Sequence, residues 1–221
     1  MNEPDPRPRQ EEAIAAVSSI GNLKSEICNG PWFFSDPAAV TLVRNTADSW
    51  DRTPFAQGSK AKGPTGGIDC VGFVEEVMRE TGVAPAFNFP RSDADYKGHA
   101  HNDKIVDYLR GQKTDDPQSA QLARIFAKLE NIEELVPKAE WPNRLVINTG
   151  LMPGDLLVIQ PRIGIWHLPI MMTDRMFKHC AFPGGVTEGD ITQEDYRSRI
   201  VAIFRARSQS EICNLKSEIS P

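Results

Sequence analysis

The chain has 221 residues, of which 40% are hydrophobic and 25% charged, so it is long enough to bury one sizeable core. Its formal net charge of −5 excludes a general nucleic-acid binder, because no basic stripe is available to neutralise phosphates. No run of about 18 apolar residues occurs, so we expect no membrane span. The N-terminus lacks the apolar segment of a secretory signal, which predicts a cytoplasmic protein unless it is exported by another route or its start is misassigned.

The two ends of the chain carry related segments. Residues 22–29 read Asn-Leu-Lys-Ser-Glu-Ile-Cys-Asn, and the same seven-residue cycle recurs within residues 210–219. Two copies are too few for a coiled coil, so we interpret them as a translated tandem repeat, with a docked pair of termini as the alternative. In this interpretation Cys28 and Cys213 carry no chemistry. We expect three segments: a flexible N-terminal segment (1–30), a single domain (31–207) and a repeat-like disordered tail (208–221).

The first helix is predicted from Asp36 to Asp51. Asp36 is a good N-cap, and Pro37 suits the first helical position. One face of this segment is apolar at helical spacing through Val40, Val43, Ala47 and Trp50. Residues 53–67, rich in glycine, lysine and proline, are expected to form a loop that leads to the next helix.

The second helix is predicted to begin with Cys70 in its first turn. Asp69 is its N-cap, Gly82 ends it, and apolar residues recur at helical spacing in between. Unpaired backbone N–H groups and the helix dipole favour a thiolate at such a position. They can lower a cysteine pKa from about 8.5 to between roughly 3.5 and 7.5. The alternative is a buried structural cysteine.

Residues 86–148 are predicted to be a largely helical insertion that covers one side of the core. Ile105 to Leu109 fits one short helix. A second opens at Asp116-Pro117 and carries apolar residues at helical spacing through Leu122, Ile125, Phe126 and Leu129.

Other clusters of polar residues predict no site. His99 and His101 could bind a metal together with Asp95 or Asp103, but their spacing does not resemble a structural zinc site, and we expect no metal. The pairs at 75–76 and 133–134, all glutamates, are interpreted as solvated helix faces rather than paired acid and base.

From Leu151 onwards the pattern is typical of strands. Buried or alternating apolar runs follow one another with turn residues between them. The order of elements, helices first and a mostly antiparallel sheet second, predicts an α+β fold. The strands are expected at residues 156–160, 163–172, 176–182, 185–191 and 199–205.

Two histidines are predicted to face each other on this sheet. If residues 173–175 form the hairpin loop, Pro169 lies opposite His179, and His167 and His179 share one face as diagonal neighbours roughly 7–8 Å apart. A two-residue loop would instead place them on opposite faces. Cys180 points away from His179 and is expected in the core.

These residues supply the parts of a thiol-based active site. An activated cysteine needs a base to take its proton, and that base needs a polar group to orient it. Cys70, His167 and His179 fit these three roles. The alternative for each histidine is a half-buried side chain whose hydrogen bonds are satisfied within the fold.

The combination resembles the NlpC/p60 family of papain-like cysteine peptidases. The motifs are Asp69-Cys70-Val71-Gly72-Phe73-Val74 at a helix start, Pro153-Gly154-Asp155-Leu156-Leu157 before a strand, and His167 followed by His179 twelve residues later. The resemblance covers residues 36–205, apart from the insertion. It implies a papain-like fold, in which N-terminal helices carrying the nucleophilic cysteine pack on a C-terminal antiparallel sheet.

The same resemblance implies an activity and a set of roles. The reaction is hydrolysis of an amide bond in bacterial cell-wall peptides, next to D-glutamate and a diamino acid, without a cofactor. Cys70 is then the nucleophile, His167 the general base and acid, and His179 the orienting third member. The backbone N–H of Cys70, helped by Asp69, would stabilise the oxyanion. We also expect Phe55 and Trp166 to contact the peptidoglycan-type peptide.

Two positions depart from the family pattern. Many members have serine where this chain has Val71, and tyrosine where it has Phe55. The sequence therefore leaves two alternatives open. One is an amidase or acyltransferase that uses the same triad on another substrate. The other is a catalytically silent structural module, for instance one that takes part in phage-tail assembly.

Overall fold

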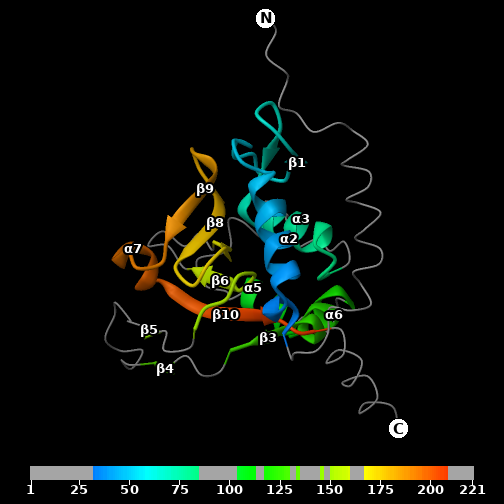
Figure 1. Cartoon of the computed structure of the whole chain (residues 1–221), viewed down its shortest axis with the longest axis vertical. Helices are drawn as coiled ribbons and strands as arrows, with labels where there is room; N and C mark the ends of the chain where they lie inside the picture. Colours follow the sequence, from blue (N-terminus) through cyan, green and yellow to red (C-terminus); the bar gives the residue numbers. More distant parts are fainter. Residues whose placement is uncertain are drawn as a thin grey trace, which may run out of the picture.

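The N-terminal helices begin at the aspartates that the sequence marks as caps. The computed structural model describes residues 32–84, 104–112, 117–129, 133–134, 145–146, 150–159 and 167–208 (Figure 1). Helix α2 (Pro37–Asp48) is capped by Asp36, which accepts a hydrogen bond of 2.6 Å from the N–H of Ala38. Helix α3 (Cys70–Glu80) is capped by Asp69 and ends before Gly82, whose φ is +75°. Both predicted helices are confirmed.

The second half of the chain forms a six-stranded antiparallel sheet, and the predicted α+β class is confirmed. The strand predicted at residues 163–172 is shorter than expected: only two residues form β7, and His167 makes an isolated bridge to Ile159. In order across the sheet, the strands are β3 (Phe126–Lys128), β10 (Ile200–Ala206), β6 (Leu156–Ile159), β7 (Ile170–Met171), β8 (Met176–Ala181) and β9 (Gly185–Asp190).

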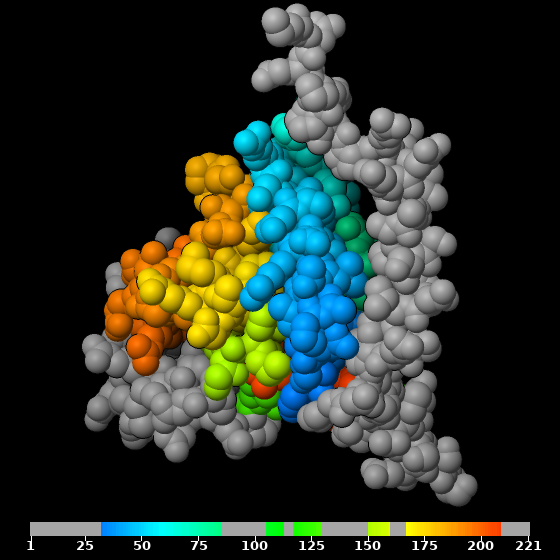
Figure 2. Space-filling view, in the orientation of Figure 1, coloured from blue at the N-terminus to red at the C-terminus, as the bar shows by residue number. Residues whose placement is uncertain are grey.

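The sheet buries apolar side chains on both faces, because successive residues of a strand point to opposite sides. One face packs against α2 and α3, with Val43, Val74 and Phe204 in that core. The opposite face holds a second cluster that includes Phe177 and Ile203. Figure 2 shows the blue and cyan residues of α2 and the following loop lying against the yellow and orange residues of β8 and β9.

Part of the predicted insertion belongs to this sheet. Helix α6 ends at Ile125, and the next three residues pair with β10 instead of continuing the helix to Leu129. The predicted helix is wrong over this stretch. Phe126 and Ala127 are buried beside β10, so pairing with a long strand outweighs the helical periodicity of the sequence.

The remaining elements are short. A hairpin of β1 and β2 lies within the predicted loop before Cys70, and the predicted helix at Ile105 to Leu109 is confirmed. Every described helix falls short of the length and apolar content that crossing a bilayer requires. These elements are η1 (Phe33–Ser35), β1 (Lys60–Ala61), β2 (Gly67–Ile68), α5 (Lys104–Leu109), α6 (Pro117–Ile125), β4 (Glu133–Glu134), β5 (Leu145–Val146) and α7 (Glu194–Arg197).

Buried charges of the sheet are paired. The guanidinium of Arg205 binds both carboxylate oxygens of Asp155 at 2.7 Å. The ammonium of Lys178, on β8, binds Asp48 and lies 2.7 Å from the Asp51 carboxylate at the end of α2. Removing one partner of such a buried pair leaves an uncompensated charge, so these contacts fix how α2 and the strands sit together.

One glutamate of the predicted solvated pair on α3 is buried. Glu75 is 1% exposed, and its carboxylate lies 2.7 Å from the ammonium of Lys60 on β1. The prediction is wrong for Glu75 because the unpredicted β1–β2 hairpin covers this side of the helix. For Glu133 and Glu134 the side chains lie outside the described part of the structure.

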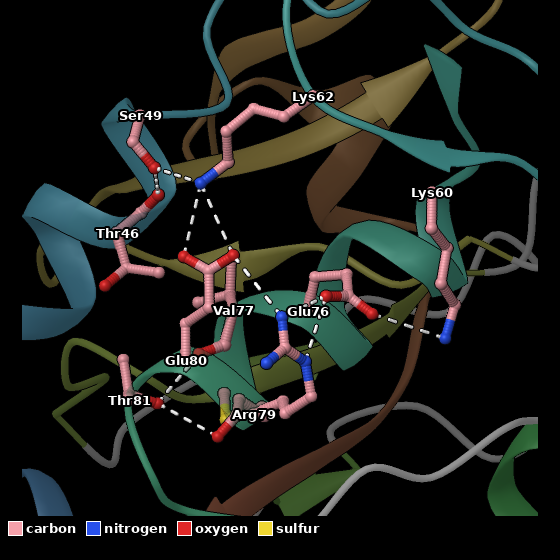
Figure 3. Close-up of polar contacts among 10 residues, drawn as sticks. Thr46, Ser49, Lys60, Lys62, Glu76, Val77, Arg79, Glu80 and Thr81 are labelled. Carbon is pink, nitrogen blue, oxygen red and sulfur yellow. Dashed lines mark hydrogen bonds and ion pairs between the residues drawn. The ribbon is translucent and has the colours of Figure 1, made fainter. Parts of the chain in front are cut away.

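A surface network joins this hairpin to α2 and α3 (Figure 3). The ammonium of Lys62 lies 2.9 Å from the Ser49 hydroxyl and 3.2 Å from the Glu80 carboxylate. Arg79 binds Glu76 at 2.6 Å one turn back along α3. Exposed pairs of this kind contribute little stability each, so the network positions the loop rather than holding the fold together.

The β8–β9 turn is locked to the loop that precedes Cys70. The backbone N–H of Val186 donates to the carbonyl of Thr53 at 2.9 Å. Gly185 has a φ of +75°, and a Cβ there would lie 2.3 Å from the Thr53 oxygen and 2.8 Å from the Cα of Pro54. Only glycine fits this contact without moving backbone.

We therefore expect Gly185→Ala to lower the free energy of unfolding by about 2–4 kcal/mol, through backbone strain and collision with the neighbouring loop. Gly184→Ala is the matched control, since its Cβ would meet nothing closer than the Ala181 oxygen at 4.0 Å. That change should alter stability by less than about 0.5 kcal/mol. Urea denaturation measures both, and equal losses would contradict this account of the turn.

Candidate functional site

The two histidines meet as the hairpin register predicts. Met171 lies opposite Phe177, and the N–H of Met172 donates to the carbonyl of Met176 at 2.8 Å, which closes a loop over residues 173–175. The rings of His167 and His179 are 4.7 Å apart between centroids and inclined by 71°. A hydrogen bond joins Nε2 of His167 to Nδ1 of His179. The predicted pairing of these side chains is confirmed.

The thiol of Cys70 lies against the backbone that follows His167. Cys70 is 7% exposed in the first turn of α3. The backbone N–H of Leu168, and those of Val71 and Cys70 itself, act on the thiol in the direction that favours its anion. Among the hydrogen bonds of the described residues, none joins this thiol to either imidazole. The structure thus brings Cys70 to the strand of His167 without a direct side-chain bond.

The pKa of Cys70 moves opposite to the expected direction. Burial raises the pKa of this thiol to about 12, and the negative charge of Asp69 adds to the increase. The expectation of a lowered pKa is therefore wrong for this conformation. The three backbone N–H groups stabilise the thiolate and lower the pKa, as predicted for a helix start. The free-energy cost of removing the thiolate from water is larger than this stabilisation, so the pKa rises.

Asp69 supports the helix start that carries Cys70. Its side chain is buried, and one carboxylate oxygen accepts from the N–H of Gly72 at 2.6 Å. The other accepts from the N–H of Gly58 at 2.8 Å. Two backbone segments are therefore tied to one carboxylate immediately before the thiol.

Both imidazoles are held neutral at pH 7. Burial lowers the pKa of His167 to about 3, with a smaller contribution from His179. Burial alone lowers the pKa of His179 to about 4. Since Nε2 of His167 already contacts His179, Nδ1 is the nitrogen of His167 that remains for another partner.

Phe55 lies near the Cys70 segment, and its contact with a substrate stays a prediction. It forms a bridge with Ile68, two residues before Cys70, and is half-buried. Its ring lies 6.0 Å from that of Phe182, at 81°. Phe182 is 81% exposed, which is unusual for a large apolar side chain, and the sequence analysis missed it. The sequence Phe-Pro-Gly-Gly, shortly after His179, is typical of a turn and could have predicted that Phe182 is exposed.

Cys180 is fully buried, so its predicted place in the core is confirmed. Its thiol donates to the carbonyl of Ile68 at 3.0 Å, on the chain segment that leads into Cys70. Burial raises the pKa of Cys180 to about 12, and the charges of Cys70 and Asp69 contribute. Cys180 therefore packs beside the nucleophile candidate but shows no polar partner that would activate it.

Several predicted positions lie outside the described residues. These include Trp166, both cysteines of the repeat-like termini, and the histidines of the weak metal candidate at 99 and 101. Within the described residues, no group of three potential metal ligands occurs. The chemistry available to the described site is that of a thiol, two imidazoles and backbone N–H groups.

Comparison with known proteins gives structural likenesses but no match in sequence. No family model matches the sequence, and no curated protein matches it either. Among solved structures, the chain is similar to a protein of Staphylococcus aureus described as similar to a lipoprotein of the NLP/P60 family. The TM-score is 0.44 and the identity 18%, over 81% of this chain and 44% of that one. The chain thus spans less than half of that protein's length.

The buried histidines make stability depend on pH. Their pKa values in the fold, about 3 and about 4, lie below the ordinary value of 6.5, so the unfolded chain binds protons that the fold does not. The free energy of unfolding should fall as the pH decreases from about 6.5 towards 3, by up to roughly 3 kcal/mol per imidazole at pH 4.5.

The variant His179→Phe tests this, because it removes one titrating group and leaves an apolar ring in its place. We expect about half the wild-type loss of stability between pH 7.5 and 4.5, measured by urea denaturation. The value at pH 7.5, where His167 and His179 are neutral in the folded chain and largely neutral in the unfolded chain, is the internal control. An unchanged pH dependence would show that His179 titrates normally in the fold.

Proposed function

We propose that the protein is a thiol hydrolase that cleaves an amide bond through an acyl-enzyme on Cys70. The observation that carries this is the hydrogen bond between His167 and His179, together with the backbone N–H of Leu168, the residue after His167, which acts on the Cys70 thiol. In this proposal Cys70, at the start of α3, is the nucleophile, His167, in the segment just before β7, is the base, and His179 on β8 orients that base. These are the parts that nucleophilic catalysis requires.

The protonation states of Cys70, His167 and His179 before the reaction determine when the thiol proton is transferred. Thiol and imidazoles are all neutral, so the proton leaves Cys70 during attack rather than beforehand. The Nδ1 of His167 takes this proton as the sulfur bonds to the carbonyl carbon, in a conformation in which the thiol and Nδ1 lie within hydrogen-bond distance. His179 accepts from Nε2 of His167 and stabilises the imidazolium. The backbone N–H of Cys70, supported by Asp69 as the N-cap of α3, is the proposed donor to the developing oxyanion.

The remaining steps use the same residues. His167 gives its proton to the leaving amine, which departs and leaves a thioester on Cys70. Water, deprotonated by His167, then attacks the thioester carbon; the C–S bond breaks, the acid is released, and His167 returns the proton to the Cys70 sulfur. We propose a peptidoglycan-type peptide as the substrate, which rests on the sequence resemblance, and Phe55 and Trp166 as its contacts.

A second candidate is a catalytically silent module with the same fold. The deep burial of Cys70, its raised pKa and the absence of a thiol–imidazole bond in the described structure favour it. A third candidate keeps the triad and changes the substrate. The apolar residues Phe55 and Val71, near the thiol, favour an amide other than a wall peptide.

The variant Cys70→Ala tests the proposed function on a wall peptide that contains D-glutamate and a diamino acid, with cleavage followed by mass spectrometry. Loss of the nucleophile should lower turnover at least about 10³-fold. Cys180→Ala is the matched control, since it removes a neighbouring buried thiol and should leave turnover within a few-fold of wild type.

The outcomes separate the three candidates. Wild-type turnover by Cys70→Ala would rule out the acyl-enzyme. Cleavage of other amides, but not of the wall peptide, would favour the changed substrate. No cleavage of any amide, together with iodoacetamide labelling of Cys70 no faster than of Cys180 at pH 6, would favour the silent module.

A further inference from the structure

His179 is enclosed by aromatic rings on the side away from α3. The ring of Phe177 lies 5.1 Å from that of His179, at 84°, and the ring of Tyr196 lies 5.9 Å from it, at 85°. Phe177 and Tyr196 also touch each other edge to face at 4.9 Å. His179 is 4% exposed. The two aromatic side chains thus exclude most water from this imidazole.

The backbone explains why these rings can gather here. Phe177 and His179 are two residues apart on β8, so they share a face of the sheet. Gly189 lies opposite Phe177, and a Cβ at Gly189 would come within 2.2 Å of that ring. Phe177 therefore lies across the bare backbone of β9. Tyr196 comes from α7 (Glu194–Arg197), just before β10, and closes the cluster.

The hydrogen bond between the histidines demands one tautomer. If Nδ1 of His167 is to accept a proton from the thiol, the proton of neutral His167 sits on Nε2. His167 then donates from Nε2, and Nδ1 of His179 must accept. A protonated His179 would donate from Nδ1 instead, which would place the proton of His167 on Nδ1 and remove the base. His179 therefore has to stay neutral wherever the site works.

We propose that Phe177 and Tyr196 are positioning residues that keep His179 dry and neutral, so that His167 retains a free Nδ1. The catalytic consequence rests on the proposed function, but the effect on His179 does not. The aromatic rings act through His179 and touch neither the thiol nor the substrate.

The charged groups nearby do not offer an alternative cause. On β9, Glu188 lies across from Lys178 on the other face of the sheet, and Asp190 binds Arg175. On α7, Asp195 binds Arg199 at 2.9 Å, and Glu194 is exposed. Burial lowers the pKa of His179 with no contribution from any charged group of the described structure. The other titratable group facing this imidazole across the sheet is His167.

The test is the titration of His179 by NMR, in the full chain, with Tyr196→Ala. The sequence has four histidines, so replacing His99 and His101 by glutamine leaves two imidazole signals to follow. Opening the cluster to water should raise the midpoint of His179 by about 1–2 pH units towards 6.5. Tyr196→Phe should leave it unchanged, because the ring and not the hydroxyl excludes water. Arg197→Ala, at the exposed next position of α7, is the matched control.

If Tyr196→Ala does not fold, Tyr196→Gln gives the same test, because a hydrated amide brings water to His179 while filling more of the space. A wild-type midpoint near 6.5, or a midpoint that neither variant moves, overturns the inference. If the enzyme turns over substrate, the acid limb of its pH–rate profile should follow the NMR midpoint. A shifted midpoint without any turnover would support the aromatic cover and count against the proposed function alone.

Discussion

The turn over residues 173–175 decides which side chains of β7 and β8 share a face, and the site depends on that choice. With this register, His167 and His179 lie on one side, and Lys178 and Cys180 lie on the other, against α2 and α3. A slip by one residue would exchange the two sets. The imidazoles would enter the helical core, and the ammonium of Lys178 would lose the carboxylates at the end of α2. The two buried pairs therefore enforce the same register from opposite faces.

Burial and reactivity oppose each other at Cys70. A helix start contributes about 0.3–1 kcal/mol in favour of an anion, and up to roughly 2 kcal/mol in favourable, partly buried geometries. The pKa of this thiol rises from 9.0 to about 12, which corresponds to about 4 kcal/mol against the thiolate. Desolvation is the larger effect here. Chemistry at this site accordingly needs a proton transfer that is coupled to the attack, or an opening that admits water or substrate to the thiol.

Local signals in the sequence were sufficient for much of this structure. Asp36 and Asp69 mark helix starts because a short polar side chain can accept backbone N–H bonds, and the pairing of the histidines follows from the period of two along a strand. What failed depended on contacts distant in sequence. Glu75 is buried by the β1–β2 hairpin, which the glycine-rich sequence before Cys70 does not predict. Phe126 has helical spacing in the sequence but pairs with β10 as a strand residue. The predicted direction of the Cys70 pKa shift was wrong for the same reason, because burial depends on how the whole molecule packs.

The predicted insertion contributes strand β3 to the main sheet, where β3 pairs with β10. Strand β10 pairs with β6 on one side and with β3 on the other, through Phe204, Arg205 and Ala206. If the chain were trimmed to the elements on either side of the insertion, β10 would become an edge, with its backbone N–H and C=O groups open to pairing with another molecule. A core excised in this way would be prone to aggregation even with every residue of the site intact. With the insertion present, the edge at that side of the sheet is the three-residue strand β3 instead of the seven-residue strand β10.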